Sequence, residues 1–135
     1  MRFFIIGINL LLLLSLQLAF AQTAAPDSRA AVITLLNEAK AAYEQGQNEQ
    51  AAAALERALR IDPRNPALWH NLAGVRLQQE DWMRAANLAA KSNSLASDNK
   101  WLRVRNWVLI ALACEAMSNM ECTMEARSRA RALAN

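Results

Sequence analysis

The feature that most constrains the fold of this chain is a 34-residue period in its apolar and turn residues. The pairs with this spacing are Leu35 and Trp69, Ala39 and Ala73, Ala51 and Ala85, Ile61 and Leu95, and Asn65 and Asn99. Within each period, two stretches with apolar residues every three or four positions are separated by a short polar turn. Such a unit cannot bury its apolar face alone, so successive units are expected to stack as repeated helix pairs.

Composition agrees with helices and argues against a sheet protein. The 135 residues are 54% hydrophobic, with alanine supplying much of that content, and include only 3 Gly and 3 Pro. Alanine favours helix, and so few turn-forming residues leave little material for hairpins. Helices joined by short turns pack antiparallel to their neighbours. We therefore predict an all-α fold, a short α-solenoid of antiparallel helix pairs.

Apolar spacing and turn residues predict six helices. The first is expected between Ser28 and Gly46, with an apolar face of Val32, Leu35, Leu36, Ala39 and Tyr43. The second is expected to begin at an Asn48 cap and to bury Ala51, Ala52, Leu55, Ala58, Leu59 and Ile61. Asn65 and Asp81 are predicted caps of the third and fourth helices. The last two helices are expected over about 100–118 and 121–134.

The stretch from Glu49 to Pro66 resembles the second half of a tetratricopeptide repeat (TPR) with its exit turn, Asp62-Pro63-Arg64-Asn65-Pro66. The stretch Trp69 to Ala73 resembles the opening of the next repeat, and Trp82 matches the aromatic residue that opens its second helix. The 34-residue period is also that of this family. The resemblance implies that residues 28–135 form a TPR domain.

The third unit departs from the pattern, so two clear repeats and one divergent terminal helix pair are expected. Ser92 and Ser97 replace an alanine and a proline of the first repeat. The small residue that matches Ala85 is taken as Ala126, which lies 41 residues later instead of 34. This spacing predicts about two additional turns in the helix over 101–118. An atypical last unit is typical of a cap.

The resemblance implies a binding module that presents a concave groove lined by the first helix of each repeat. The groove residues it implies are Lys40, Tyr43, Glu44, His70, Asn71, Gly74, Leu77 and Gln78. One class of TPR proteins grips a peptide's terminal carboxylate with Lys, Asn and Arg side chains. Asn71 is in a matching place, but Leu36 and Lys40 replace a Lys and an Asn of that clamp, and the third repeat is out of register. A more general groove for an extended segment or a helix is therefore expected.

Residues 1–21 have the pattern of a secretory signal peptide, with one basic residue, an apolar stretch, and a cut between Ala21 and Gln22. Cleavage leaves 114 residues, of which 22–27 are expected to form a flexible tether. No cysteine follows the cut, so lipoprotein processing is not expected. The predicted location is the periplasm, without stable membrane insertion after cleavage. An uncleaved inner-membrane anchor is the alternative, because residues 3–20 approach spanning length.

Cys114 and Cys122 are predicted to form a disulfide. An even number of cysteines in an oxidising compartment favours a bridge. Both residues lie four positions from Ser118, at the expected turn, so they face each other on antiparallel helices. Two buried thiols that pack helix against helix are the alternative. A redox-active pair is disfavoured, because such pairs are usually spaced C-x-x-C.

The sequence predicts no enzymatic activity, no cofactor and no metal site. His70 is the only histidine and has no Cys, Asp or Glu at ligand or triad spacing, so we expect an exposed or groove-lining residue. Only 2 glycines follow residue 21, too few for a phosphate-binding loop. The adjacent carboxylates Glu80 and Asp81 fall in an interhelix turn, where helix capping explains them.

The net charge of +3 is too small to predict a nucleic-acid partner, and it is concentrated at the C-terminal end. Arg127, Arg129 and Arg131 fan around the last helix, where cations compensate the helix dipole. Docking to an acidic partner or an anionic lipid is the alternative for these arginines. Trp101 and Trp107 are interpreted as packing on the preceding helix pair, with one of them exposed for a partner.

These observations predict a periplasmic TPR scaffold or adaptor that binds a protein or peptide partner of the cell envelope through its groove. The alternative is a structural envelope protein that self-associates as a homodimer through its terminal helix pair.

Overall fold

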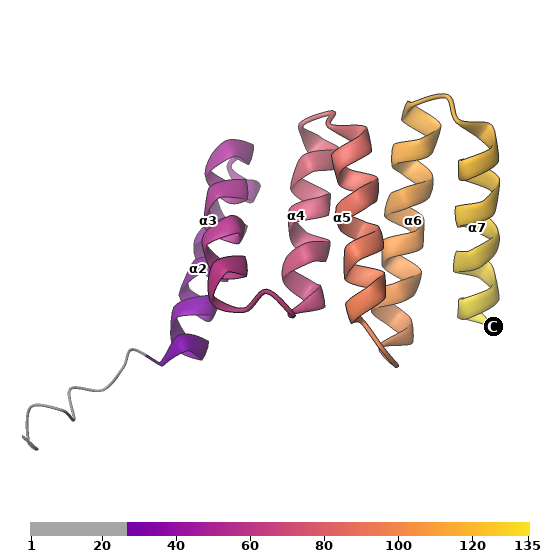
Figure 1. Cartoon of the computed structure of the whole chain (residues 1–135). Coiled ribbons are helices and arrows are strands. Elements are labelled where there is room, and N and C mark those ends of the chain that lie inside the picture. The colour runs from indigo at the N-terminus through magenta and orange to yellow at the C-terminus, as the bar shows by residue number, and fades with distance from the viewer. Residues whose placement is uncertain (1–26) are drawn as a thin grey trace, which may run out of the picture.

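A computed structural model describes residues 27–135, and it folds this part of the chain into six helices and no strands (Figure 1). The helices are α2 (Ser28–Glu44), α3 (Asn48–Ile61), α4 (Pro66–Gln78), α5 (Trp82–Leu95), α6 (Lys100–Ala116) and α7 (Met120–Ala134). They pack in chain order as three antiparallel pairs, α2–α3, α4–α5 and α6–α7, stacked along the molecule. The predicted all-α solenoid is confirmed.

The predicted signal peptide, its cleavage site between Ala21 and Gln22, and tether residues 22–26 lie outside the described residues. Asp27, the last residue assigned to the tether, accepts a hydrogen bond from the Arg29 N–H and so caps α2. No helix among the described residues combines the length and the apolar character that crossing a bilayer demands.

Side-chain caps start five of the six helices. Asn65, Asp81, Asn99 and Asn119 accept backbone N–H bonds at the starts of α4 to α7, as Asp27 does for α2. These bonds satisfy donors that the helix leaves unpaired. The predicted Asn48 cap is wrong: α3 begins at Asn48 itself, and the N-cap residue before it makes no side-chain bond.

The turn inside each helix pair uses the same left-handed residue. Gly46, Glu80 and Ser118 have φ angles of 72°, 60° and 57°. In each case this residue donates to a carbonyl three positions back, and the next residue donates to one five back. These paired bonds are the Schellman motif that ends many helices. The first two positions are 34 residues apart and the last two are 38 apart, so the third repeat carries one additional turn and the predicted two turns are wrong.

The core forms two clusters, one around α2, α3 and the start of α4 and one that extends from α4 to α7. Alanines with no exposed surface, among them Ala51, Ala58 and Ala85, let the helices approach closely. The predicted burial of Ile61 is wrong, because this side chain is 41% exposed. Tyr43, also 41% exposed, lies on the concave side, where it borders the cavity described below.

Candidate binding groove

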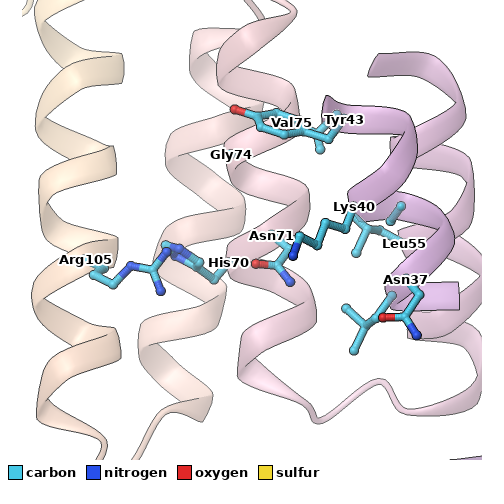
Figure 2. A pocket seen from close by; sticks show the side chains of 11 residues that line it. Asn37, Lys40, Tyr43, Leu55, His70, Asn71, Gly74, Val75 and Arg105 are labelled. Atoms are coloured by element: carbon cyan, nitrogen blue, oxygen red, sulfur yellow. The ribbon is translucent and has the colours of Figure 1, made fainter. Parts of the chain in front are cut away.

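A cavity of about 410 Å³ lies on the side of the solenoid formed by the first helices of the three pairs. Its lining comes from α2, α4 and α6, together with Leu55 of α3 (Figure 2). Its volume is within the range of natural ligand pockets. The lining residues are Leu36, Asn37, Ala39, Lys40, Tyr43, Leu55, His70, Asn71, Gly74, Val75 and Arg105.

Of the eight predicted groove residues, the structure brings five together around this cavity: Lys40, Tyr43, His70, Asn71 and Gly74. Three predicted positions do not line it. Glu44 lies beside it and pairs with Lys40 at 3.8 Å. Leu77 packs against the second core cluster, and Gln78 is exposed at the end of α4.

Asn37 and Arg105 line the cavity and were missed by the sequence reasoning. Both are one 34-residue period from Asn71, so the three side chains occupy the same position in successive repeats. Applying the period to Asn71 itself was the signal that would have found them. The same spacing shows that the first half of α6 keeps the 34-residue register of α4. The shifted register of the third repeat therefore does not argue against a carboxylate clamp on this face.

The charges around the cavity are basic. Figure 2 shows Lys40 extending from α2 toward Asn71, and Arg105 extending from α6 toward His70. Among residues 27–135, Lys40 and Arg105 are the charged residues of the lining, and no carboxylate belongs to it. The Lys40 and Glu44 side chains are 76% and 63% exposed, so their mutual pairing is weak and leaves the lysine available. The cavity therefore favours a ligand with acidic groups.

His70 is buried at 8% exposure, so the exposed alternative is wrong and the groove-lining one holds. Its Nδ1 lies 2.7 Å from the Oδ1 of Asn106 on α6. Asn106 uses its Nδ2 to donate to Ser92 and Asn93 of α5, so its Oδ1 is the acceptor and His70 Nδ1 donates. Burial lowers the pKa of His70 from its ordinary value, the Asn106 bond opposes this shift, and the charge of Arg105 adds to it.

This polar cluster ties three helices together. Ser92 completes it by donating to the Pro66 carbonyl at 2.8 Å. The four members of the cluster are His70, Ser92, Asn93 and Asn106. The residues 34 positions before them are all apolar and belong to or pack against the first core cluster, between the first and second helix pairs: Leu36, Ala58, Leu59 and Leu72. The departure noticed at Ser92 is therefore one part of a concerted change, in which a polar network replaces an apolar contact.

Cys114 and Cys122 are disulfide bonded in the structure, with Cα atoms 5.8 Å apart across the α6–α7 turn. This is the predicted pairing, and the separation is ordinary for a disulfide. Cys114 is 2% exposed and belongs to the second core cluster.

The C-terminal arginines and tryptophans have separate surroundings. Arg127 pairs with Glu115 at 2.8 Å and Arg129 with Glu125 at 3.0 Å, both at the surface. Trp107 packs against the second core cluster, with Arg129 over its ring. Trp101 is 68% exposed, and the Arg105 guanidinium lies over its ring, 4.6 Å from the ring centroid.

Three stacked antiparallel helix pairs, with a cavity on the face of their first helices, define a helical-repeat protein of the α-solenoid class. A family model described as a TPR repeat matches residues 39–79. The globular C-terminal domain of P. aeruginosa LpoP is 35% identical, over 82% of this chain and 99% of that one, with a TM-score of 0.72. The chain therefore belongs to the TPR family.

A second solved structure supports the fold alone. The N-terminal domain of stress-induced protein-1 (STI-1) from C. elegans has a TM-score of 0.74 at 18% identity, over 81% of this chain and 88% of that one. Curated protein sequences contain no significant match to the chain.

Proposed function

We propose that this protein is an exported, non-enzymatic TPR adaptor that binds an acidic segment of a protein partner in its groove. The observation that carries the proposal is the convergence of Lys40 from α2, Asn71 from α4 and Arg105 from α6 on one cavity without a lining carboxylate. Lysine, arginine and amide donors form their strongest hydrogen bonds with carboxylates. Membership of the TPR family supports a protein partner.

The groove is also suited to the apolar part of such a segment. Leu36, Val75 and the ring of Tyr43 provide apolar walls beside the basic groups. Because the cavity is about 410 Å³, it accommodates a few side chains, while the rest of the segment extends along the concave face. An acidic residue next to an aliphatic or aromatic one matches this lining.

The experiment compares charge-reversal variants in partner capture. Immobilised wild-type protein, Lys40→Glu, Arg105→Glu and the double variant are incubated with a detergent-solubilised envelope fraction, and bound proteins are quantified by mass spectrometry. Each reversal replaces a charge-assisted bond by repulsion, so we expect a loss of about tenfold or more in capture. Lys91→Glu on α5 is the matched control, because Lys91 is exposed and does not line the cavity.

A second variant separates charge from shape. Lys40→Ala with Tyr43→Ala is expected to weaken capture while helicity and melting remain unchanged, because both side chains are exposed. Equal capture by wild type and all groove variants would show that the partner binds elsewhere.

The periplasmic location is part of the proposal and rests on the pattern of residues 1–21. Cell fractionation and the intact mass of the purified protein test it. We expect a soluble periplasmic species that begins at Gln22. A membrane-bound species with its leader retained would support the inner-membrane anchor instead.

A further inference from the structure

The last helix pair carries a stripe of exposed apolar side chains. Trp101, Val108 and Leu112 of α6 are 68%, 48% and 49% exposed, and their spacing of seven and four residues places them on one side of the helix. Met120 and Met124 of α7, 67% and 61% exposed, are one turn apart on the neighbouring helix. We call these five residues and the hollow beside them the terminal face. Within residues 27–135 no helix packs beyond it (Figure 1).

The terminal face has a hollow of about 310 Å³ between α6 and α7. Its floor is apolar, formed by Val108, Ala111, Leu112 and Ala130. Arg127 and Arg131 form its edge. Arg127 shares its charge with Glu115, whereas Arg131 has no carboxylate partner among the described residues. The hollow is therefore an apolar channel with a cationic edge, separate from the cavity lined by Lys40 and Asn71.

The solenoid itself shows which element fits such a channel. The equivalent face of the preceding pair, α4–α5, is covered by α6, whose buried residues include Leu102, Leu109 and Ile110. A helix placed on α6–α7 in the same way would present apolar residues with the same spacing. Because α6 and α7 already satisfy their own backbone groups, the face offers side-chain packing and is suited to a helix more than to a strand.

The positive charge of Arg127 and Arg131 favours one kind of binding partner for this face over another. A second copy of this chain, related by a two-fold axis, would bring two arginine edges against each other, which costs binding energy. A helix with acidic residues beside its apolar stripe would instead place carboxylates opposite Arg127 and Arg131. We propose that the terminal face binds an amphipathic, acidic α-helix of a partner protein as a further helix of the solenoid. This binding site is additional to the groove, and the two meet only where Arg105, which lines the groove, lies over the ring of Trp101.

The test uses designed peptides as probes. The first is a helical peptide of about 18 residues with leucines at the spacing of Leu102, Leu109 and Ile110 and glutamates on the flanks. The second replaces every glutamate by lysine, and the third scrambles the first. Labelled peptides are titrated with purified protein by fluorescence anisotropy. We expect binding of the acidic peptide, with affinity at least about tenfold weaker for the lysine peptide and undetectable for the scrambled one.

Variants locate the binding on the protein. Leu112→Glu and Val108→Glu place carboxylates in the channel and are expected to weaken the acidic peptide by about tenfold or more. Ile33→Glu on α2 is the matched control, since Ile33 is 52% exposed and lies at the opposite end of the solenoid. Because all three residues are about half exposed, their melting temperatures are expected to stay close to that of the wild type.

Four results would overturn the proposal. The first is equal binding of the acidic and lysine peptides, and the second is peptide binding that survives Leu112→Glu. The third is a wild-type dimer in size-exclusion chromatography with light scattering that Leu112→Glu converts to a monomer, because the occupant is then a second copy. The fourth is binding to phosphatidylglycerol vesicles without binding to any peptide.

Discussion

A buried polar network links His70, Ser92, Asn93 and Asn106. Replacing these four residues by the apolar residues found 34 positions earlier tests whether they act as one unit. Asn106→Leu alone removes three hydrogen bonds and leaves the buried Nδ1–H of His70 without an acceptor. An unsatisfied buried donor costs about 1–3 kcal/mol, and the larger leucine adds about 1 kcal/mol of overpacking. We therefore expect a loss on the order of 3 kcal/mol, which lowers the melting temperature by roughly 10–20 °C in a domain of this size.

The fourfold variant His70→Leu, Ser92→Ala, Asn93→Leu and Asn106→Leu reproduces the residues found 34 positions earlier. Because both partners of each bond are then replaced by apolar groups, its stability is expected to return to within about 1 kcal/mol of the wild type. Urea denaturation followed by circular dichroism gives the free energies of unfolding, and unchanged m-values confirm that the unfolding reaction is the same. A fourfold variant as unstable as Asn106→Leu would refute the equivalence of the two interfaces.

Three further predictions concern single features. The folded-state pKa of His70 is lowered below 6.5, so the folded protein binds this proton more weakly than the unfolded protein does. The free energy of unfolding should therefore fall as the pH drops below about 6.5 and level off below the folded-state pKa. Urea denaturation from pH 8 to 5 measures this decrease, which should be absent in His70→Gln. Glu80→Gly should raise stability by about 1 kcal/mol and Gly46→Ala lower it by a similar amount, because both positions have positive φ; equal stabilities by thermal melting would contradict this. Reducing the Cys114–Cys122 bond, which has a sequence separation of 8, should lower the free energy of unfolding by about 2–3 kcal/mol. Hydrogen exchange should then accelerate first in α6 and α7. Acceleration spread evenly over all helices would show that the bond does not hold this pair together.

The repeat architecture was predictable because its signals are local and recur. The caps Asn65 and Asn99 recur 34 residues apart at the turns between successive pairs, and the alanines that let helices approach keep their spacing. The additional turn in α6 was overestimated because small residues recur on every turn of a buried helix. Matching Ala85 to Ala126 instead of Thr123 changed the count by about one turn.

The groove residues were predictable only in part, because helical spacing identifies the side of a helix that faces the groove but not which side chains at its margins reach the cavity. Tyr43 and Gly74 were found, whereas Leu77 turns into the core although it is only three residues from Gly74. Whether a residue at such a boundary faces the cavity depends on how the next helix pair packs, which is a tertiary property. The network around Asn106 was missed for a related reason, since its members come from three helices and none of them forms a motif alone.

The network also determines what His70 offers to a ligand in the groove. His70 Nδ1 donates to the Oδ1 of Asn106. The neutral ring therefore has its proton on Nδ1, and Nε2 is left as a hydrogen-bond acceptor. Lys40 and Arg105 are donors, so the groove combines an acceptor with two cationic donors. A carboxylate with a neighbouring N–H or hydroxyl satisfies both kinds of group at once. Long-range ¹H–¹⁵N spectra of the single histidine are expected to show the Nδ1–H tautomer, and Asn106→Leu should shift this population toward Nε2–H. A wild-type protein in the Nε2–H form would contradict the donor assignment on which this complementarity rests.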